Sequence, residues 1–237
     1  MKLTHLAKAL LASSMLFTAV NANAADPVTV TGSAALTSDY LFRGISQTGN
    51  NVAAQVGMTF AHESGAYFSL WGSNIGFTEG GLELDGLLGY SGKAGEVGYD
   101  VGVMHYGYPS DDAALGYDEV YASVNTMGAK LGVNYSSDYF NKSDKFMYIY
   151  ASYSTEVSGV GLSAGVGMNM FDSPAMMVKA LGTTGTDDSY MDYKLAASKS
   201  LAGLTFEGAY IGSNIDEKEC GAGLCEGRFV VTMTKGF

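Results

Sequence analysis

The chain has 237 residues, of which 47% are hydrophobic, 16% are charged and 32 are glycine. Acidic residues outnumber Lys and Arg by 24 to 13, which gives a formal net charge of −11. This charge excludes a nucleic-acid-binding protein, which needs a basic surface, and the apolar content excludes a disordered chain. The 16 tyrosines, the many glycines and the three prolines are typical of a β protein.

Residues 1–24 have the layout of a secretory signal peptide. A basic start, an apolar core and a small-residue cleavage site follow one another: Lys2 and Lys8, residues 9–20, and Ala22-Asn23-Ala24. The core is shorter than the roughly 20 residues needed to span a membrane, so a membrane anchor is disfavoured. We predict export through the inner membrane, cleavage between Ala24 and Ala25, and a single domain over residues 25–237.

After the signal, apolar and polar side chains alternate with the period of two residues that characterises β-strands. In residues 28–42 one set is Val28, Val30, Gly32, Ala34, Leu36, Ser38, Tyr40 and Phe42, and the opposite set is mostly polar. The same alternation recurs in residues 82–91, 97–103 and 130–136. The whole pattern predicts strands at 28–42, 51–61, 66–75, 82–91, 97–106, 117–125, 129–137, 146–155, 162–171, 189–199, 204–213 and 227–237.

The connections between these strands alternate between long and short. The short ones, such as HESG, SGKAGE and LAG, are glycine-containing turns, and the long ones include residues 172–188 and 214–227. Outer-membrane barrels show this alternation, because their strands run up and down between short periplasmic turns and long external loops. We therefore predict an all-β fold, a transmembrane antiparallel up-and-down β-barrel of about 12 strands.

The chain end and the aromatic residues support the same fold. Phe229, Val231, Met233 and Phe237 share one face of the last strand, and Lys235 lies on that face near the periplasmic interface, where it can snorkel. Aromatic residues gather at strand ends, as the two interfacial girdles of a barrel require. They are Tyr40, Phe42, Phe60, Tyr67, Tyr90, Tyr99, Tyr106, Tyr135, Phe146 and Phe171.

Two segments, YLFRGISQT (residues 40–48) and SGAYFSLWGSNIGF (residues 64–77), resemble the TorF-type porin family, a Gcw-type family of uncharacterised proteobacterial exported proteins. Later blocks follow in the same order: LELDGLLGYSG, YDVGVMHYGYP, YDEVYASV and NYSSDYF. The resemblance covers nearly all of the chain after the signal, and it implies an outer-membrane barrel classed as a porin. It implies no substrate, catalytic residue or cofactor, and residues 173–188 and the cysteine-containing loop depart from it.

The polar face of the predicted strands supplies the candidate pore-lining residues. They are Glu83, Asp85, Asp100, Lys130, Asp192, Lys194, Glu207 and Arg228, together with Asp39 at the end of the first strand. An excess of fixed carboxylates favours passage of cations or zwitterions, and Glu83, Asp85 and Asp100 on adjacent strands are its expected source. In the alternative, these charges pair across a narrow lumen and plug it. Arg43 either closes its loop on neighbouring acids, which we favour, or lines the mouth.

Cys220 and Cys225 flank four residues of the last long loop, and the oxidising periplasm favours a disulfide between them. Metal binding with Glu219 and Glu226 is the weaker alternative. Only His62 and His105 follow the signal, and neither forms part of a recognisable catalytic arrangement, so the sequence predicts no enzyme and no cofactor.

The sequence thus predicts a passive diffusion channel for small solutes or ions with a leaning to cations. The alternative is a closed structural or surface-interaction barrel in the outer membrane without channel activity. The expected partners are the outer-membrane lipid bilayer, the solutes, and the periplasmic chaperones and barrel-assembly machinery during biogenesis.

Overall fold

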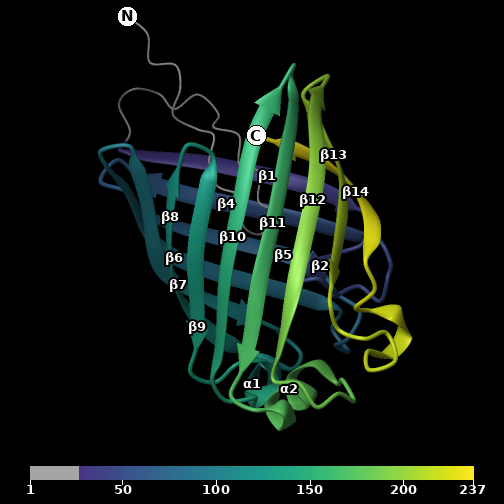
Figure 1. Cartoon of the computed structure of the whole chain (residues 1–237). Helices are drawn as coiled ribbons and strands as arrows, with labels where there is room; N and C mark the ends of the chain where they lie inside the picture. The colour runs from purple at the N-terminus through teal and green to yellow at the C-terminus, as the bar shows by residue number, and fades with distance from the viewer. Residues whose placement is uncertain (1–26) are drawn as a thin grey trace, which may run out of the picture.

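The structure is a computed structural model that describes residues 27–237. The predicted signal peptide and its cleavage between Ala24 and Ala25 lie outside the described residues. Twelve antiparallel strands form a closed barrel in the order β1-β14-β13-β12-β11-β10-β9-β8-β7-β6-β5-β4 (Figure 1). This confirms the predicted fold class. A closed sheet pairs the backbone groups of every strand and leaves no edge.

The strands match the alternating segments of the sequence closely. Their bounds are β1 Val28–Thr37, β4 Ala53–His62, β5 Ala66–Asn74, β6 Leu82–Ala94, β7 Val97–Gly107, β8 Tyr117–Thr126, β9 Ala129–Ser136, β10 Phe146–Val157, β11 Val160–Phe171, β12 Ser189–Leu201, β13 Leu204–Ser213 and β14 Arg228–Gly236. The short strands β2 (Leu41–Phe42) and β3 (Ile45–Ser46) form a separate two-stranded sheet.

The two ends of the barrel differ in the length of their connections. The five short turns and the C-terminus lie at one end, the turn end, and each short turn contains a glycine at positive φ: Gly65, Gly95, Gly128, Gly159 and Gly203. The long loops lie at the other end, the loop end, with the helices α1 (Asp112–Leu115) and α2 (Pro174–Leu181) (Figure 1). Two 3₁₀ turns lie in other long loops of this end, η1 (Phe140–Lys142) between β9 and β10 and η2 (Gly221–Gly223) between β13 and β14. Among the described residues, no helix has the length and apolarity needed to cross a membrane.

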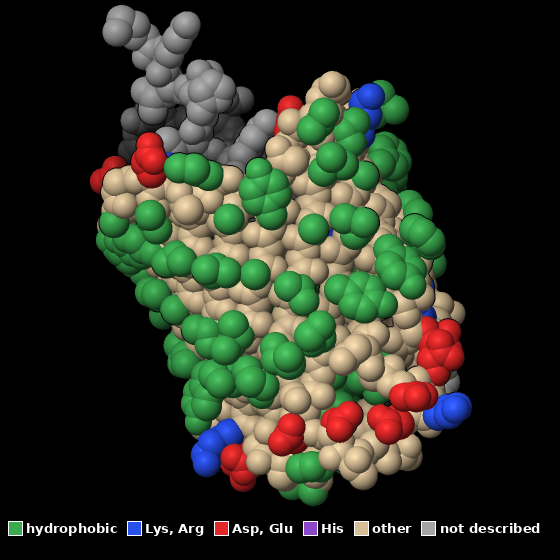
Figure 2. All heavy atoms as spheres, in the orientation of Figure 1, with side chains coloured by type: hydrophobic (Ala, Val, Ile, Leu, Met, Phe, Trp, Pro, Cys, Tyr) green, Lys and Arg blue, Asp and Glu red, His purple; other side chains and the backbone are tan. Residues whose placement is uncertain are grey.

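Alternation places apolar side chains on the outside of the barrel, as predicted. Leu88, Leu195 and Val231 point outward and are 60%, 65% and 60% exposed. Figure 2 shows apolar side chains over the visible wall, while acidic side chains gather at the edge of the loop end. An exposed apolar surface of this extent is unfavourable in water and suits contact with lipid.

The prediction of one strand over residues 28–42 is wrong, because β1 ends at Thr37. The backbone N–H of Ser38 still donates to the Val231 carbonyl oxygen over 2.9 Å. The chain then turns into the barrel, where the Asp39 carboxylate accepts hydrogen bonds from the hydroxyls of Ser46 (2.7 Å) and Thr48 (2.8 Å). These bonds close residues 39–48 into a compact hairpin loop. The segment 43–50, expected in an external loop, therefore begins inside the lumen.

The girdle prediction is wrong for six of its ten aromatic residues. Phe60, Tyr90, Tyr99 and Tyr135 lie on the outer face of the wall, as a girdle requires. Tyr67 instead points inward and donates to Asp100, and Phe42 is half-buried at the hairpin. A further four are buried inside the loop end: Tyr40, Tyr106, Phe146 and Phe171. Buried aromatic rings therefore fill much of the lumen at this end.

The seam between β1 and β14 closes the barrel and is short. It has five paired positions, from Ser33–Gly236 to Thr37–Thr232, whereas β1 and β4 share ten. Two further hydrogen bonds extend the seam, from the Gly32 N–H to the Phe237 carbonyl oxygen (2.7 Å) and from the Phe237 N–H to the Gly32 carbonyl oxygen (2.9 Å). Phe237 therefore contributes directly to closure.

We predict that deletion of Phe237 lowers the fraction of folded barrel, because it removes both terminal hydrogen bonds of the shortest ladder. The measurement is the heat-dependent gel migration of purified barrel refolded into detergent. Met127→Ala, an exposed substitution in a short turn, is the matched control and is expected to fold normally. Equal folded fractions for the deletion and the control would show that β14 closes the sheet without its last residue.

Candidate functional site

The hairpin of β2 and β3 crosses the lumen at the loop end. Phe42 pairs with Ile45, so that Arg43 and Gly44 form a two-residue turn. Both turn residues have positive φ, 49° for Arg43 and 80° for Gly44. Two positive values are typical of a type I′ turn, in which Asn and Gly are favoured and Arg is unusual. Arg43 adopts this conformation because of the contacts of its side chain.

Arg43 at the hairpin tip is buried and bound to the opposite wall. Its two terminal nitrogens donate to the two carboxylate oxygens of Glu119 on β8, both over 2.8 Å. The guanidinium also lies 4.6 Å from the ring centre of Phe42 and 4.5 Å from that of Tyr148. Burial opposes the charge on Arg43, but the adjacent Glu119 carboxylate raises its pKa well above the ordinary value. The Arg43 guanidinium is therefore charged at every physiological pH.

The backbone of the tip is fixed as well. The Tyr190 hydroxyl on β12 donates to the Arg43 carbonyl oxygen over 3.1 Å. A Cβ atom at Gly44 would meet the Gly212 carbonyl of β13 at 2.5 Å, so only glycine fits against this wall. The tip thus contacts β8, on the far side of the barrel from β1, and also β12 and β13.

The base of the hairpin is anchored by a second ion pair. Arg228 at the start of β14 donates to Asp39 over 3.0 Å, and it also donates to the Asn50 side chain and to the Gly223 carbonyl oxygen. These contacts connect the hairpin to both strands of the seam and to the last long loop. Asp39 and Arg228 therefore hold the hairpin in place.

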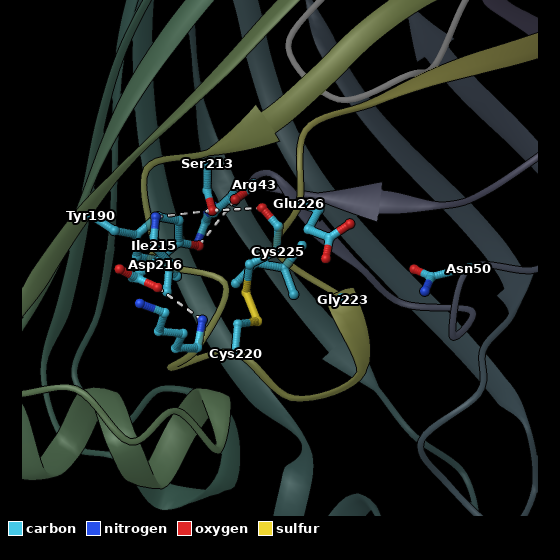
Figure 3. The surroundings of a disulfide bond; sticks show 12 residues. Arg43, Asn50, Tyr190, Ser213, Ile215, Asp216, Cys220, Gly223, Cys225 and Glu226 are labelled. Atoms are coloured by element: carbon cyan, nitrogen blue, oxygen red, sulfur yellow. Dashed lines mark hydrogen bonds between the residues drawn. A yellow bond between two sulfur atoms is a disulfide. The ribbon is translucent and has the colours of Figure 1, made fainter.

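The last long loop carries a disulfide between Cys220 and Cys225, whose Cα atoms are 5.9 Å apart. The loop lies beside the hairpin, and Ser213 at the end of β13 donates to the Cys225 carbonyl oxygen over 3.2 Å (Figure 3). The Leu224 carbonyl oxygen accepts from the Ser46 N–H of β3 over 2.9 Å. The disulfide loop thus continues the hairpin sheet by one hydrogen bond.

A chain of contacting aromatic rings, some stacked and some edge-to-face, lies at the loop end around the hairpin and is here called the aromatic cap. Its members, all no more than 7% exposed, are Tyr106, Tyr117, Tyr139, Phe146, Phe171 and Tyr190. Neighbouring ring centres lie 4.5, 4.7, 3.9, 4.9 and 6.4 Å apart in this order, which runs from β7 to β12. Burial raises the pKa of Tyr139, in the loop before β10, to about 12, so its hydroxyl is neutral. The hairpin and the aromatic cap together close the loop end.

Below the hairpin, the barrel encloses a cavity of about 460 Å³. It extends from His62 and Gly65 at the turn end to Phe42 and Arg43 at the hairpin. Six of the eight predicted pore-lining residues line it: Asp85, Asp100, Lys130, Asp192, Lys194 and Glu207. The other two, Glu83 and Arg228, are not among its lining residues. Glu83 is 2% exposed beside Tyr40, and Arg228 binds Asp39, which itself lines the cavity.

The structure also brings in residues that the sequence analysis did not single out. Glu119, the partner of Arg43, is fully buried, while its neighbour Asp118 points outward and binds His105 over 2.8 Å. Alternation in YDEVYASV places Glu119 on the inner face with Tyr121 and Ser123. This alternation could have identified Glu119 as a lumen-facing residue from the sequence. His62 lies at the end of β4 and binds the Ser64 hydroxyl over 2.9 Å. Within residues 27–237, no three metal-ligating side chains are grouped as a metal site.

The arrangement defines a twelve-stranded antiparallel barrel with an apolar outer wall and a polar lumen, the class of fold to which porins belong. The chain belongs to the Gcw_chp family of bacterial proteins of unknown function, whose model matches residues 21–237.

Solved structures share the fold at low sequence identity. A NanC porin is 8% identical with a TM-score of 0.53, and the match covers 87% of this chain and 98% of the porin. A chain from a study of in-meso crystallization of membrane proteins is 10% identical with a TM-score of 0.54, and the match covers 87% of this chain and 83% of the other. At these identities the likeness concerns the fold alone. No curated protein matches the chain.

We predict that the Arg43–Glu119 pair contributes to stability far more than an exposed pair. Arg43→Asn keeps a residue suited to the turn and removes the charge, and Glu119→Gln removes the other charge. Each leaves an uncompensated buried ion, so the free energy of unfolding falls by about 3–5 kcal/mol. The measurement is urea unfolding of the barrel in lipid vesicles.

The control is Lys145→Gln, which breaks an exposed pair of 3.8 Å with Asp172 and is expected to cost at most about 1 kcal/mol. The double variant of Arg43 and Glu119 should cost clearly less than the sum of the single variants. Additive costs would mean that the two side chains do not stabilise the hairpin as a pair.

Proposed function

We propose that the protein is an outer-membrane channel for small solutes, with its conduction route along the lumen and its mouth closed at rest by the hairpin and the aromatic cap. The observation that carries this proposal is a cavity lined by several charged side chains, which runs below the hairpin through most of the barrel. A barrel with a purely structural role has no need for an unfilled, charged interior. The TorF-type porin resemblance and the porin fold support the same proposal.

The orientation follows from barrel architecture. Long loops of outer-membrane barrels face the outside and short turns face the periplasm. The hairpin, the cap and the disulfide loop then lie on the external side, and the cavity reaches the periplasmic side. Export by a signal peptide cleaved between Ala24 and Ala25, with periplasmic chaperones and the barrel-assembly machinery as partners, belongs to this proposal.

The channel is proposed to lean toward cations. Among the lining residues, Lys194 and Glu207 form an ion pair of 2.7 Å and cancel each other. Asp85, Asp100 and Asp192 have no partner of opposite charge within ion-pair distance in the described residues. The other lining cations are Lys130 and Arg43, and Arg43 is paired with Glu119. Fixed negative charge in a narrow lumen raises the local cation concentration.

A closed barrel without channel activity is the second candidate. It is favoured by one specific observation, the bidentate Arg43–Glu119 bond across the lumen beneath a packed aromatic layer. In this case the hairpin is a permanent part of the structure, and no voltage or solute displaces it.

We predict that purified mature protein in a planar bilayer gives discrete conductance steps with a cation-selective reversal potential in a salt gradient. Asp85→Asn combined with Asp100→Asn is expected to lower the cation-to-anion permeability ratio, because two lumen carboxylates are lost. Asp118→Asn, on the outer face, is the control and should leave the ratio unchanged. A folded barrel that stays silent at all voltages would support the closed barrel, and an unchanged ratio in the double variant would remove these acids from selectivity.

A further inference from the structure

The lumen cavity contains fixed charged groups, as a ligand-binding site does. Two of its carboxylates are held in fixed positions by neutral hydrogen-bond donors. Asp100 accepts from the hydroxyls of Tyr67 over 2.7 Å and Tyr121 over 3.3 Å. A side chain fixed in this way is pre-organised for a ligand, since little entropy is lost when the ligand binds.

Asp192, on β12, is held in the same manner. It accepts from the Tyr148 hydroxyl over 3.2 Å and from the Asn169 amide over 2.7 Å. All these donors are uncharged, so neither carboxylate is neutralised by its own support. Their negative charge is available to a ligand in the cavity.

Tyrosine rings connect the two carboxylates. Tyr148 and Tyr150 stack on β10 with ring centres 5.3 Å apart, and Lys130 lies 5.7 Å above the Tyr150 ring. Both tyrosines line the cavity together with Tyr67 and Tyr121. The face of an aromatic ring carries partial negative charge and attracts organic cations.

The roof of the cavity has unused polar atoms. Asp85 and Gln55 line the cavity and are 6% and 7% exposed, and Asp85 Oδ1 and Gln55 Nε2 have no hydrogen-bond partner within residues 27–237. Buried polar atoms without partners are costly. An ammonium group can supply the donor that Asp85 Oδ1 lacks, whereas Gln55 Nε2 needs an acceptor.

From this arrangement we infer that the lumen cavity binds small organic cations that carry ammonium groups, with Asp100 and Asp192 as the anionic contacts and the tyrosine rings as walls. Anions are disfavoured by the three carboxylates without a basic partner, and neutral solutes leave these charges uncompensated. The inference names the solute class of the proposed channel, and it rests on that function for the route by which the solute enters. Binding itself requires only the folded barrel.

Trp71 provides a natural probe for the test. It is the single tryptophan of the chain, it lines the cavity, and its ring centre lies 5.3 Å from that of Tyr40. Purified mature barrel in detergent is titrated with 1,4-diaminobutane at constant ionic strength. Trp71 emission and isothermal titration calorimetry are followed in parallel, so that an optically silent event is also detected. Size-matched 1,4-butanediol and succinate are the neutral and anionic comparison ligands.

The expected result is saturable binding of the diamine and no saturable binding of the diol or the dicarboxylate. Asp100→Asn and Asp192→Asn are each expected to weaken diamine binding at least tenfold. Asp118→Asn, exposed on the outer face, is the matched control and should bind as the unmodified barrel does. Heat-dependent gel migration verifies that each variant is folded.

Equal binding of the diol or succinate would overturn the inference, as would a folded barrel that does not bind the diamine or unchanged affinity in both lumen variants. The outcome is separable from the proposed channel. Diamine binding by a barrel that never conducts would refute the proposed channel and support the binding site. Conduction without diamine binding would support the channel and refute the binding site.

Discussion

The buried ion pair between Arg43 and Glu119 determines what the interior of this barrel can do. It fixes a two-residue turn, unfavourable for Arg, against the wall opposite β1. Without a partner of opposite charge, either side chain would be a buried uncompensated ion at this end of the barrel. The hairpin, the aromatic rings around it and the cavity beneath it all take their positions from this contact, and the Asp39–Arg228 pair secures the other end of the hairpin.

The lumen consequently has two layers of opposite character. Aromatic rings pack at the loop end, where Tyr139 stacks on Phe146 with ring centres 3.9 Å apart. Carboxylates, tyrosine hydroxyls and the Lys194–Glu207 pair line the cavity below. In a channel of this kind, displacing the β2–β3 hairpin opens the lumen. A barrel filled along its whole length would have to unfold to conduct.

Strand positions could be predicted from the sequence because lipid-facing and lumen-facing side chains alternate on almost every strand. β13 runs over Leu204–Ser213, as the pattern predicted. The same logic failed at residues 38–48, where Tyr40 and Phe42 continue the alternation of β1 although the chain has left the wall. An apolar residue facing lipid and one packed in an aromatic cap look alike in a sequence, so the internal hairpin could not be recognised.

The alternation of side chains also made the lumen-facing charges predictable from the sequence. The ion pairs that they form were not predictable. Asp100, Asp192 and Lys130 follow from the phase of their strands, but the Arg43–Glu119 contact joins residues 76 positions apart through a hairpin whose path the pattern does not reveal. The contact depends on where the first loop turns inward, which is decided by the bonds of Asp39 with Ser46 and Thr48.

The most direct test of this account is the single-channel conductance of a variant in which residues 41–46 are replaced by two glycines, compared with the unmodified barrel in the same bilayer. The hairpin is the element that crosses the lumen, so the account predicts conductance steps several-fold larger in the variant. A folded variant with the same conductance as the unmodified barrel, or with none, would contradict the claim that the hairpin closes the lumen.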